Sequence, residues 1–211
     1  MRFDHHLHTS RHSPDSVIDP LELIERAPRV GLQGVVITEH DHQWAPDELA
    51  DLASRAGDLR VFSGAEISAR EGHFLVYGLP SLADVEPGIR VADLLKVVRG
   101  HKAAIVAAHP FRWGQPFDAI VAENGPAFDA IELVSNNVTD ETRSLAERLI
   151  GRTPMRATGS SDAHEIDVVG CYFTEFSTPI RSMADFVSAL QAGGFRPGHR
   201  RGIRLSCGPA D

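Results

Sequence analysis

Histidine is the residue type in this chain that could do the most chemistry, because the 211 residues include 11 histidines. Imidazole is the commonest metal ligand in proteins, and it changes charge near neutral pH. His6 and His8 are separated by one residue, so on a β-strand both side chains would leave the same face, together with Asp4. Two imidazoles on one face could bind one metal ion. The spacing alone is weak evidence, since ordinary surfaces also carry such pairs.

Other histidines and acids recur where short apolar runs end. These segments are Thr38-Glu39-His40-Asp41, Gly64-Ala65-Glu66, His109-Pro110, Asp162-Ala163-His164 and the Gly72-His73 start of a further run. In a parallel α/β barrel the C-terminal ends of the strands form one face, where active-site residues that are distant in sequence meet. One histidine after a strand is usually structural, but five such coincidences predict a common polar site.

Short β-branched runs alternate with amphipathic helical stretches along the chain. The expected strands are 2–7, 34–38, 60–67, 74–77, 104–108, 130–134, 155–159 and 171–176. The expected helices are 20–31, capped by Asp19, then 47–56, 91–100, 140–150, capped by Thr139, and 183–192. This order favours right-handed crossovers and a mainly parallel sheet. We therefore expect an α/β fold, and the gathering of polar residues favours a (β/α) barrel over an open sheet.

The composition suits one globular domain with a sizeable core, since 42% of the residues are hydrophobic. The longest apolar run, 103–108, is far shorter than the roughly 20 residues of a membrane span, and residues 1–6 lack the apolar segment of a secretory signal. Cys171 and Cys207 are too few for a disulfide framework. We expect a catalytic barrel over 1–195, a peripheral Arg-rich tail over 196–211, and a reducing, cytoplasmic location.

The polar segments resemble the four motifs of the polymerase and histidinol phosphatase (PHP) superfamily. Those motifs are a D-x-H-x-H-T start, a T-[DE]-H-[DN] segment, an H-P segment and a late D-x-H, and here they stand at 4–9, 38–41, 109–110 and 162–164. The segments at 64–66 and 72–78 resemble the bridging-glutamate and G-H segments of the family. The resemblance implies a distorted (β/α)7 barrel, two or three divalent metal ions and phosphoester hydrolysis.

The resemblance also implies a trinuclear metal site and assigns its ligands. The ligands would be His6, His8, Glu66 and Asp162 for the first ion, Glu66, His73 and His109 for the second, and Asp15, His40 and His164 for the third. Asp15 matches the family's S-x-D spacing from Ser13, although His12 lies in the same loop and could substitute. Imidazole and carboxylate ligands suit zinc, manganese or iron, and the sequence does not choose among them.

The candidate catalytic residues are Glu66, Asp162, His164 and Arg112. A metal pair lowers the pKa of a bound water and stabilises the transition state of phosphoester cleavage. Arg112, three residues after His109, could bind a phosphate oxygen bidentately, or could form an ordinary surface ion pair.

Further residues near the ligand segments could support the site. Metal-bound imidazoles need an acceptor for their second N–H, and the candidates are Asp4, Glu39 and Asp41. The 135–137 segment could orient substrate, and Trp44 or Trp113 could line the pocket or simply pack.

The leading interpretation is a metal-dependent phosphoric ester hydrolase that uses a metal-activated hydroxide on a small substrate, such as a nucleotide or sugar phosphate. The alternatives are a 3'-5' exonuclease or phosphodiesterase acting on short oligonucleotides, a non-catalytic metal-binding interaction module, and an amide hydrolase. The formal charge of −8 argues against a general nucleic-acid binder, and no membrane partner is expected. The sequence specifies neither the substrate nor the oligomeric state.

Overall fold

The computed structural model describes residues 1–125 and 127–200. The strands in this part of the chain are β1 (Arg2–Asp4), β2 (Gly34–Ile37), β3 (Arg60–Ser63), β4 (Ala65–Ala69), β5 (Gly72–Tyr77), β6 (Ala104–Ala107), β7 (Ala130–Val134), β8 (Arg156–Gly159), β9 (Tyr172–Phe176) and β10 (Phe195–His199). The helices are α1 (Pro20–Arg29), α2 (Pro46–Arg55), α3 (Val91–Gly100), α4 (Phe117–Asn124), α5 (Asp140–Ile150) and α6 (Met183–Ala192), with short 3-10 turns η1 (Arg112–Gly114) and η2 (Ile166–Val168).

The strands form two five-stranded sheets. Their orders are β10-β9-β1-β2-β3 and β4-β5-β6-β7-β8. Isolated parallel bridges join the sheets, between Leu7 and Ala163 on one side and between His40 and Glu66 on the other. The fold is therefore mixed α/β. Over the described ranges the ladders do not close into one barrel, so a complete (β/α)7 barrel stays an expectation.

The expectation of a mainly parallel sheet is wrong. Strand β5 runs antiparallel to β4 and to β6, and β9 runs antiparallel to β1 and to β10. Only residues 70 and 71 separate β4 from β5, and a parallel pair needs a crossover of a dozen or more residues. The expected strand 60–67 also divides at Gly64, because β3 and β4 belong to different sheets.

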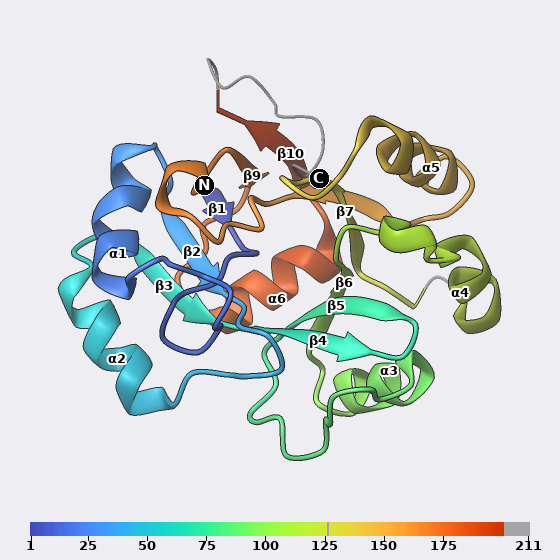
Figure 1. Cartoon of the computed structure of the whole chain (residues 1–211), viewed down its shortest axis with the longest axis horizontal. Coiled ribbons are helices and arrows are strands. Elements are labelled where there is room, and N and C mark those ends of the chain that lie inside the picture. The colour runs from blue at the N-terminus through green and yellow to red at the C-terminus, as the bar shows by residue number, and fades with distance from the viewer. Residues whose placement is uncertain (126, 201–211) are drawn as a thin grey trace.

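Helices cover the outer faces of both sheets, and one helix fills the middle (Figure 1). Helices α1 and α2 pack on the first sheet, where Leu23 and Leu52 share a core with Val35. Helices α3, α4 and α5 pack on the second sheet. The inner faces of the two sheets share a third core with α6, in which Phe186 packs among the inward side chains of Phe3 and Tyr77. This helix supports the strands from within, so their ends are held in fixed positions.

Local sequence signals explain where two of the helices begin. The Asp19 side chain accepts a hydrogen bond from the Leu21 N–H at 2.7 Å, and Pro20 occupies the first helical position of α1. The Thr139 side chain caps α5 by accepting from the Thr142 N–H at 3.2 Å. Both predicted caps are confirmed.

The C-terminal part of the described chain adds an edge strand. Strand β10 pairs with β9 from Phe195 to His199, so the sheet continues past the expected boundary at residue 195. The rest of the expected tail, 201–211, with Cys207, lies outside the described residues. None of the helices described is both long enough and apolar enough to cross a membrane.

Candidate metal centre

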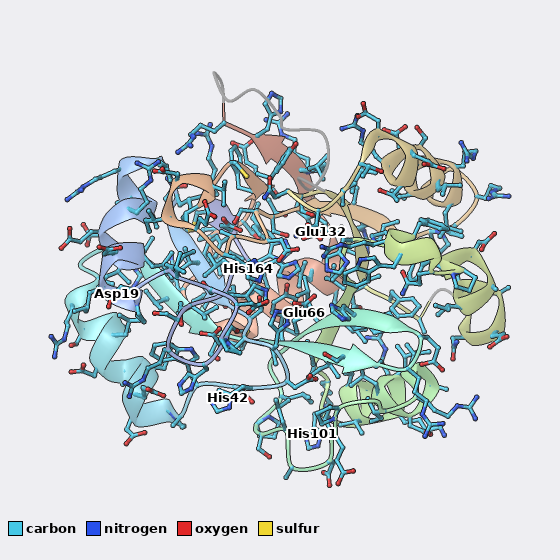
Figure 2. All side chains as sticks on the ribbon, in the orientation of Figure 1. Asp19, His42, Glu66, His101, Glu132 and His164 are labelled. Atoms are coloured by element: carbon cyan, nitrogen blue, oxygen red, sulfur yellow. The ribbon has the colours of Figure 1, made fainter. Side chains whose placement is uncertain are left out.

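The predicted metal ligands gather where strand ends from the two sheets meet. Figure 2 shows Glu66 and His164 near the middle of the molecule, whereas Asp19 and His101 lie toward its periphery. Three sets of donor atoms lie within 4.8 Å of one another: His6, His8, Glu66 and Asp162; Glu66, His73 and His109; and His8, His40 and His164. The first two sets have the membership expected from the sequence for the first and second ions.

Glu66, on β4, lies between two groups of imidazoles and is 1% exposed. The distances from its Oε2 are 3.3 Å to Nε2 of His6, 3.2 Å to Nε2 of His8 and 3.1 Å to Nδ1 of His40. The distances from its Oε1 are 2.9 Å to Nδ1 of His73 and 3.1 Å to Nε2 of His109. Each oxygen therefore faces its own group, as a carboxylate that bridges two cations would.

The innermost donor atoms fit a metal ion because they lack hydrogen-bond partners. Within the described part of the chain, Nε2 of His6, Nε2 of His8 and Oε2 of Glu66 are buried without one. Asp162 Oδ1 completes the group, at 3.2 Å from His6 Nε2 and 3.4 Å from His8 Nε2. A buried polar atom left unpaired costs about 1–3 kcal/mol, and a divalent cation bound by imidazole and carboxylate would satisfy all four at once.

Charge interactions among these groups override the effect of burial. Burial opposes ionisation of Glu66, but the charge of His6 and the proximity of His109 and His40 hold its pKa well below the usual value. Burial likewise opposes protonation of His8, yet Asp162 and Glu66 raise its pKa to about 9. A cation at this position would therefore displace protons from the imidazoles, and its affinity would depend on pH.

The third group has Asp15, and not His12, beside two of its imidazoles. Asp15 Oδ2 lies 3.1 Å from Nε2 of His40 and 3.2 Å from Nε2 of His164. His12 instead places its Nε2 2.9 Å from Oε2 of Glu48. The geometry thus favours Asp15 as the partner of the two imidazoles. It also brings His8 to this group, which the sequence did not suggest.

Glu132, on β7, is the supporting residue that the sequence reasoning missed. Its Oε1 lies 3.0 Å from Nδ1 of His6 and accepts from Ser160 Oγ at 2.5 Å, and its Oε2 accepts the backbone N–H of His109 at 2.9 Å. The side chain is fully buried. An acid within the apolar run 130–134 was the available signal, since a buried carboxylate needs partners. Glu132 fixes the orientation of His6, with Nε2 facing the other ligands.

The acceptors expected from the sequence act differently. Asp4 accepts the backbone N–H groups of Ser161 and Gly170, each at 2.9 Å, and burial raises the pKa of Asp4 to about 6. Asp41 accepts the backbone N–H of Ser68 at 2.8 Å. These two carboxylates therefore accept from backbone N–H groups of neighbouring segments, and not from imidazoles as expected.

Glu39 reaches the site through a hydroxyl. Its Oε2 accepts from Ser13 Oγ at 2.6 Å, and that hydroxyl lies 3.3 Å from Nδ1 of His8. Trp44 donates its indole N–H to Oε1 of Glu39 at 3.0 Å and packs in the core shared by the first sheet, α1 and α2. Asn137, from the segment expected to orient substrate, donates to Oδ2 of Asp162 at 2.6 Å and so holds a ligand in place.

Several residues at the site adopt left-handed backbone conformations. The φ angles are 50° at Asp41, 26° at His109 and 51° at Asp162. Non-glycine residues seldom adopt such angles, and each costs on the order of 1–3 kcal/mol. Strain of this kind concentrates at functional sites, where the surrounding structure holds side chains in defined directions.

Arg112, in η1, lies near the donor set formed by Glu66, His73 and His109, which is called the second group below. It shares with His73 and His109 the lining of a cavity of about 520 Å³, and its Cζ lies 4.1 Å from the ring centroid of Trp113. The expected cation therefore lines the same cavity as two of the predicted ligands.

Comparison with known proteins agrees with these observations. The family model PHP_C, PHP-associated, matches residues 141–194, from α5 to the end of α6. An uncharacterized protein of Methanocaldococcus jannaschii is 27% identical over 120 residues, which cover 53% of this chain and 68% of that protein.

Solved structures share the fold at low sequence identity. One is a two-domain protein of Bacteroides vulgatus ATCC 8482 that contains a predicted PHP-like metal-dependent phosphoesterase, with a TM-score of 0.74, 19% identity and 95% of this chain covered. This chain spans 65% of that protein's chain. Another is an amidohydrolase from Chromobacterium violaceum, with a TM-score of 0.65 and 16% identity, covering 96% of this chain and 99% of the other. The chain is therefore similar to PHP-like proteins in the PHP-associated segment at residues 141–194 and in its fold.

Proposed function

We propose that this chain is a metal-dependent hydrolase that cleaves phosphoesters of small substrates such as nucleotides or sugar phosphates. The observation that carries the proposal is the position of Glu66, whose two carboxylate oxygens face separate groups of imidazoles. When bound, divalent ions in such a pair supply a nucleophilic water at neutral pH and neutralise phosphate charge.

The protein's own residues would position the ions and the substrate. Glu66 would bridge the first and second ions, and Asp162 would face the first from the opposite strand end. Glu132 holds His6 with Nε2 directed inward, and Asn137 holds Asp162. His164 and Asp15 would hold a third ion at the more exposed side of the site.

Arg112 favours phosphate over an amide as the group that reacts. A guanidinium beside the second group could donate two parallel hydrogen bonds to non-bridging phosphate oxygens. An amide substrate carries no such charge and would gain little from this cation. Amide cleavage is nevertheless the activity in the name of one structural neighbour, so the test includes it.

The test is a hydrolysis panel run on protein loaded separately with manganese, zinc and iron. The panel contains nucleoside monophosphates, sugar phosphates, short oligonucleotides and amides. We expect phosphate release from monoesters, and loss of about 100-fold or more in Glu66→Gln, because even partners of metal ligands contribute 10- to 100-fold. Metal content is measured on the same samples.

The matched control is Glu147→Gln, which makes the same chemical change at an exposed position of α5. It should retain wild-type activity and metal content. Hydrolysis of amides alone, or no turnover of any substrate by metal-replete protein, would contradict the proposal. The second result would favour a metal-binding module.

A further inference from the structure

A cavity of about 520 Å³ opens beside the second imidazole group. Its lining includes His73, His109, Arg112 and Trp113. A substrate whose phosphate lay against the second group would have this space directly next to it.

Trp113 exposes most of its indole ring at this cavity. Its side chain is 73% exposed, whereas Trp44 is 5% exposed. The ring centroid of Trp113 lies 5.4 Å from that of His73 and 5.9 Å from that of His109, so the exposed indole directly adjoins the predicted ligands. An indole in this position presents a large, rigid apolar surface directly beside the predicted ligands.

The turn that carries Trp113 is strained and held in place. The φ angles of Phe111 and Trp113 are 69° and 54°, which are left-handed values seldom adopted by such bulky residues. Gln115 holds the turn, because its Oε1 accepts the Phe111 N–H at 3.1 Å and its Nε2 donates to the Glu71 carbonyl at 2.7 Å. The hydrogen bonds of Gln115 therefore fix the turn that carries the Trp113 indole.

The Gln115 side chain can make these hydrogen bonds because it packs directly against Gly72. A Cβ at Gly72 would lie 1.8 Å from Nε2 of Gln115, and the φ of Gly72 is 141°. Only glycine therefore lets the amide of Gln115 reach the hairpin between β4 and β5. The hairpin that carries His73 and the turn that carries Trp113 are in this way fixed to each other.

We infer that this cavity receives the leaving group of the substrate and selects one that contains a planar aromatic ring, for which a nucleoside is the representative chemical class. The inference rests on the proposed function and adds the side of the site on which the leaving group lies. The exposed indole of Trp113 offers a flat surface on which a base can stack, and Arg112, whose Cζ lies 4.1 Å from the ring centroid, remains available to the phosphate.

The reaction in this arrangement is ordinary hydrolysis. The oxygen of water forms a bond to phosphorus, the bond from phosphorus to the ester oxygen breaks, and the ester oxygen leaves with a proton from that water as an alcohol. The departing nucleoside would remain in the cavity beside Trp113 until released, while the phosphate stays near the imidazoles.

The test compares adenosine 5'-monophosphate with ribose 5-phosphate, which share the same scissile bond and differ in the base. Wild-type kcat/KM should favour the nucleotide, and Trp113→Ala should reduce this preference about 10-fold, in line with the value of base stacking on aromatic side chains. A second readout is fluorescence. The nucleotide, but not ribose 5-phosphate, should quench the wild type with saturation, and Trp113→Ala should abolish the quenching.

Two further variants complete the design. Leu21→Ala removes an exposed apolar side chain that lines a separate cavity with Trp44, so it should leave both readouts unchanged. Gln115→Ala should lower the preference as Trp113→Ala does, because it releases the turn, and its near-ultraviolet circular dichroism should report the altered indole environment.

The outcomes separate the inference from the proposed function. Equal hydrolysis of both substrates without quenching would overturn the inference and leave the phosphoesterase intact. Saturable quenching at Trp113 without any hydrolysis would support the cavity and contradict the phosphoesterase. Quenching that persists in Trp113→Ala, or a preference lost in Leu21→Ala instead, would place the base elsewhere and overturn the inference.

Discussion

Replacing Glu132 with glutamine should weaken metal binding although Glu132 is not itself an expected ligand. Burial alone would raise the pKa of Glu132, but His6 and its hydrogen bond hold that pKa below the usual value, so the side chain is an ionised acceptor at neutral pH. Its two oxygens accept hydrogen bonds from His6 Nδ1, Ser160 Oγ and the His109 N–H. A glutamine of the same size has only one accepting oxygen for these positions.

Either orientation of the new amide creates a conflict. If the amide NH2 faces His109, two N–H donors oppose each other at a backbone group that cannot change. If it faces His6, Nδ1 must accept, and the imidazole proton moves to Nε2, where it blocks metal ligation. Loss of such a partner typically costs 10- to 100-fold in metal affinity, which corresponds to about 1.4–2.7 kcal/mol.

The assay is competition for manganese or zinc with a chelating dye, on Glu132→Gln and on the exposed control Glu147→Gln. Thermal unfolding of the metal-free proteins shows whether the fold survives. An affinity within twofold of wild type in folded Glu132→Gln would refute the idea that Glu132 directs Nε2 of His6 toward a metal ion.

Three further predictions concern other groups. Asp15→Ala should lower bound metal by one ion per chain, and His12→Ala should not, as measured by elemental analysis after dialysis. Because the pKa of His8 is about 9 without metal, metal binding at pH 7.5 should release protons, and affinity should rise as the pH approaches 9; calorimetry in buffers of different ionisation enthalpy measures this release, and its absence would contradict a protonated His8. Burial raises the pKa of the Cys171 thiol to about 12, so its peptide should remain unalkylated by iodoacetamide in native protein at pH 8, and rapid labelling would show that the thiol is accessible.

The sequence predicted the candidate metal ligands better than the residues that hold those ligands in place. His6, His8 and Asp162 could be found because each follows a strand, and strand ends converge regardless of the details between them. The caps Asp19 and Thr139 could be found because capping depends on a few adjacent residues. Features that depend on a strand end or on a few adjacent residues can therefore be predicted from the sequence.

The sequence did not predict features that depend on neighbours distant along the chain. Strand β5 reads as one more apolar strand, and only the two-residue connection from β4 indicates that it is antiparallel. Glu132 reads as an isolated acid, because its partners His6 and Ser160 follow two other strands, β1 and β8. Asp4 is the last residue of β1, just before the ligands His6 and His8, yet its two oxygens accept the backbone N–H groups of Ser161 and Gly170.

The central claim is that Glu66 bridges two metal ions, and anomalous diffraction from crystals grown with manganese tests it most directly. The account predicts two anomalous peaks about 3.5–4 Å apart, one beside each carboxylate oxygen of Glu66. One peak should lie near His6 and His8, and the other near His73 and His109. A single peak, or peaks away from both oxygens of Glu66 in metal-replete protein, would contradict the account.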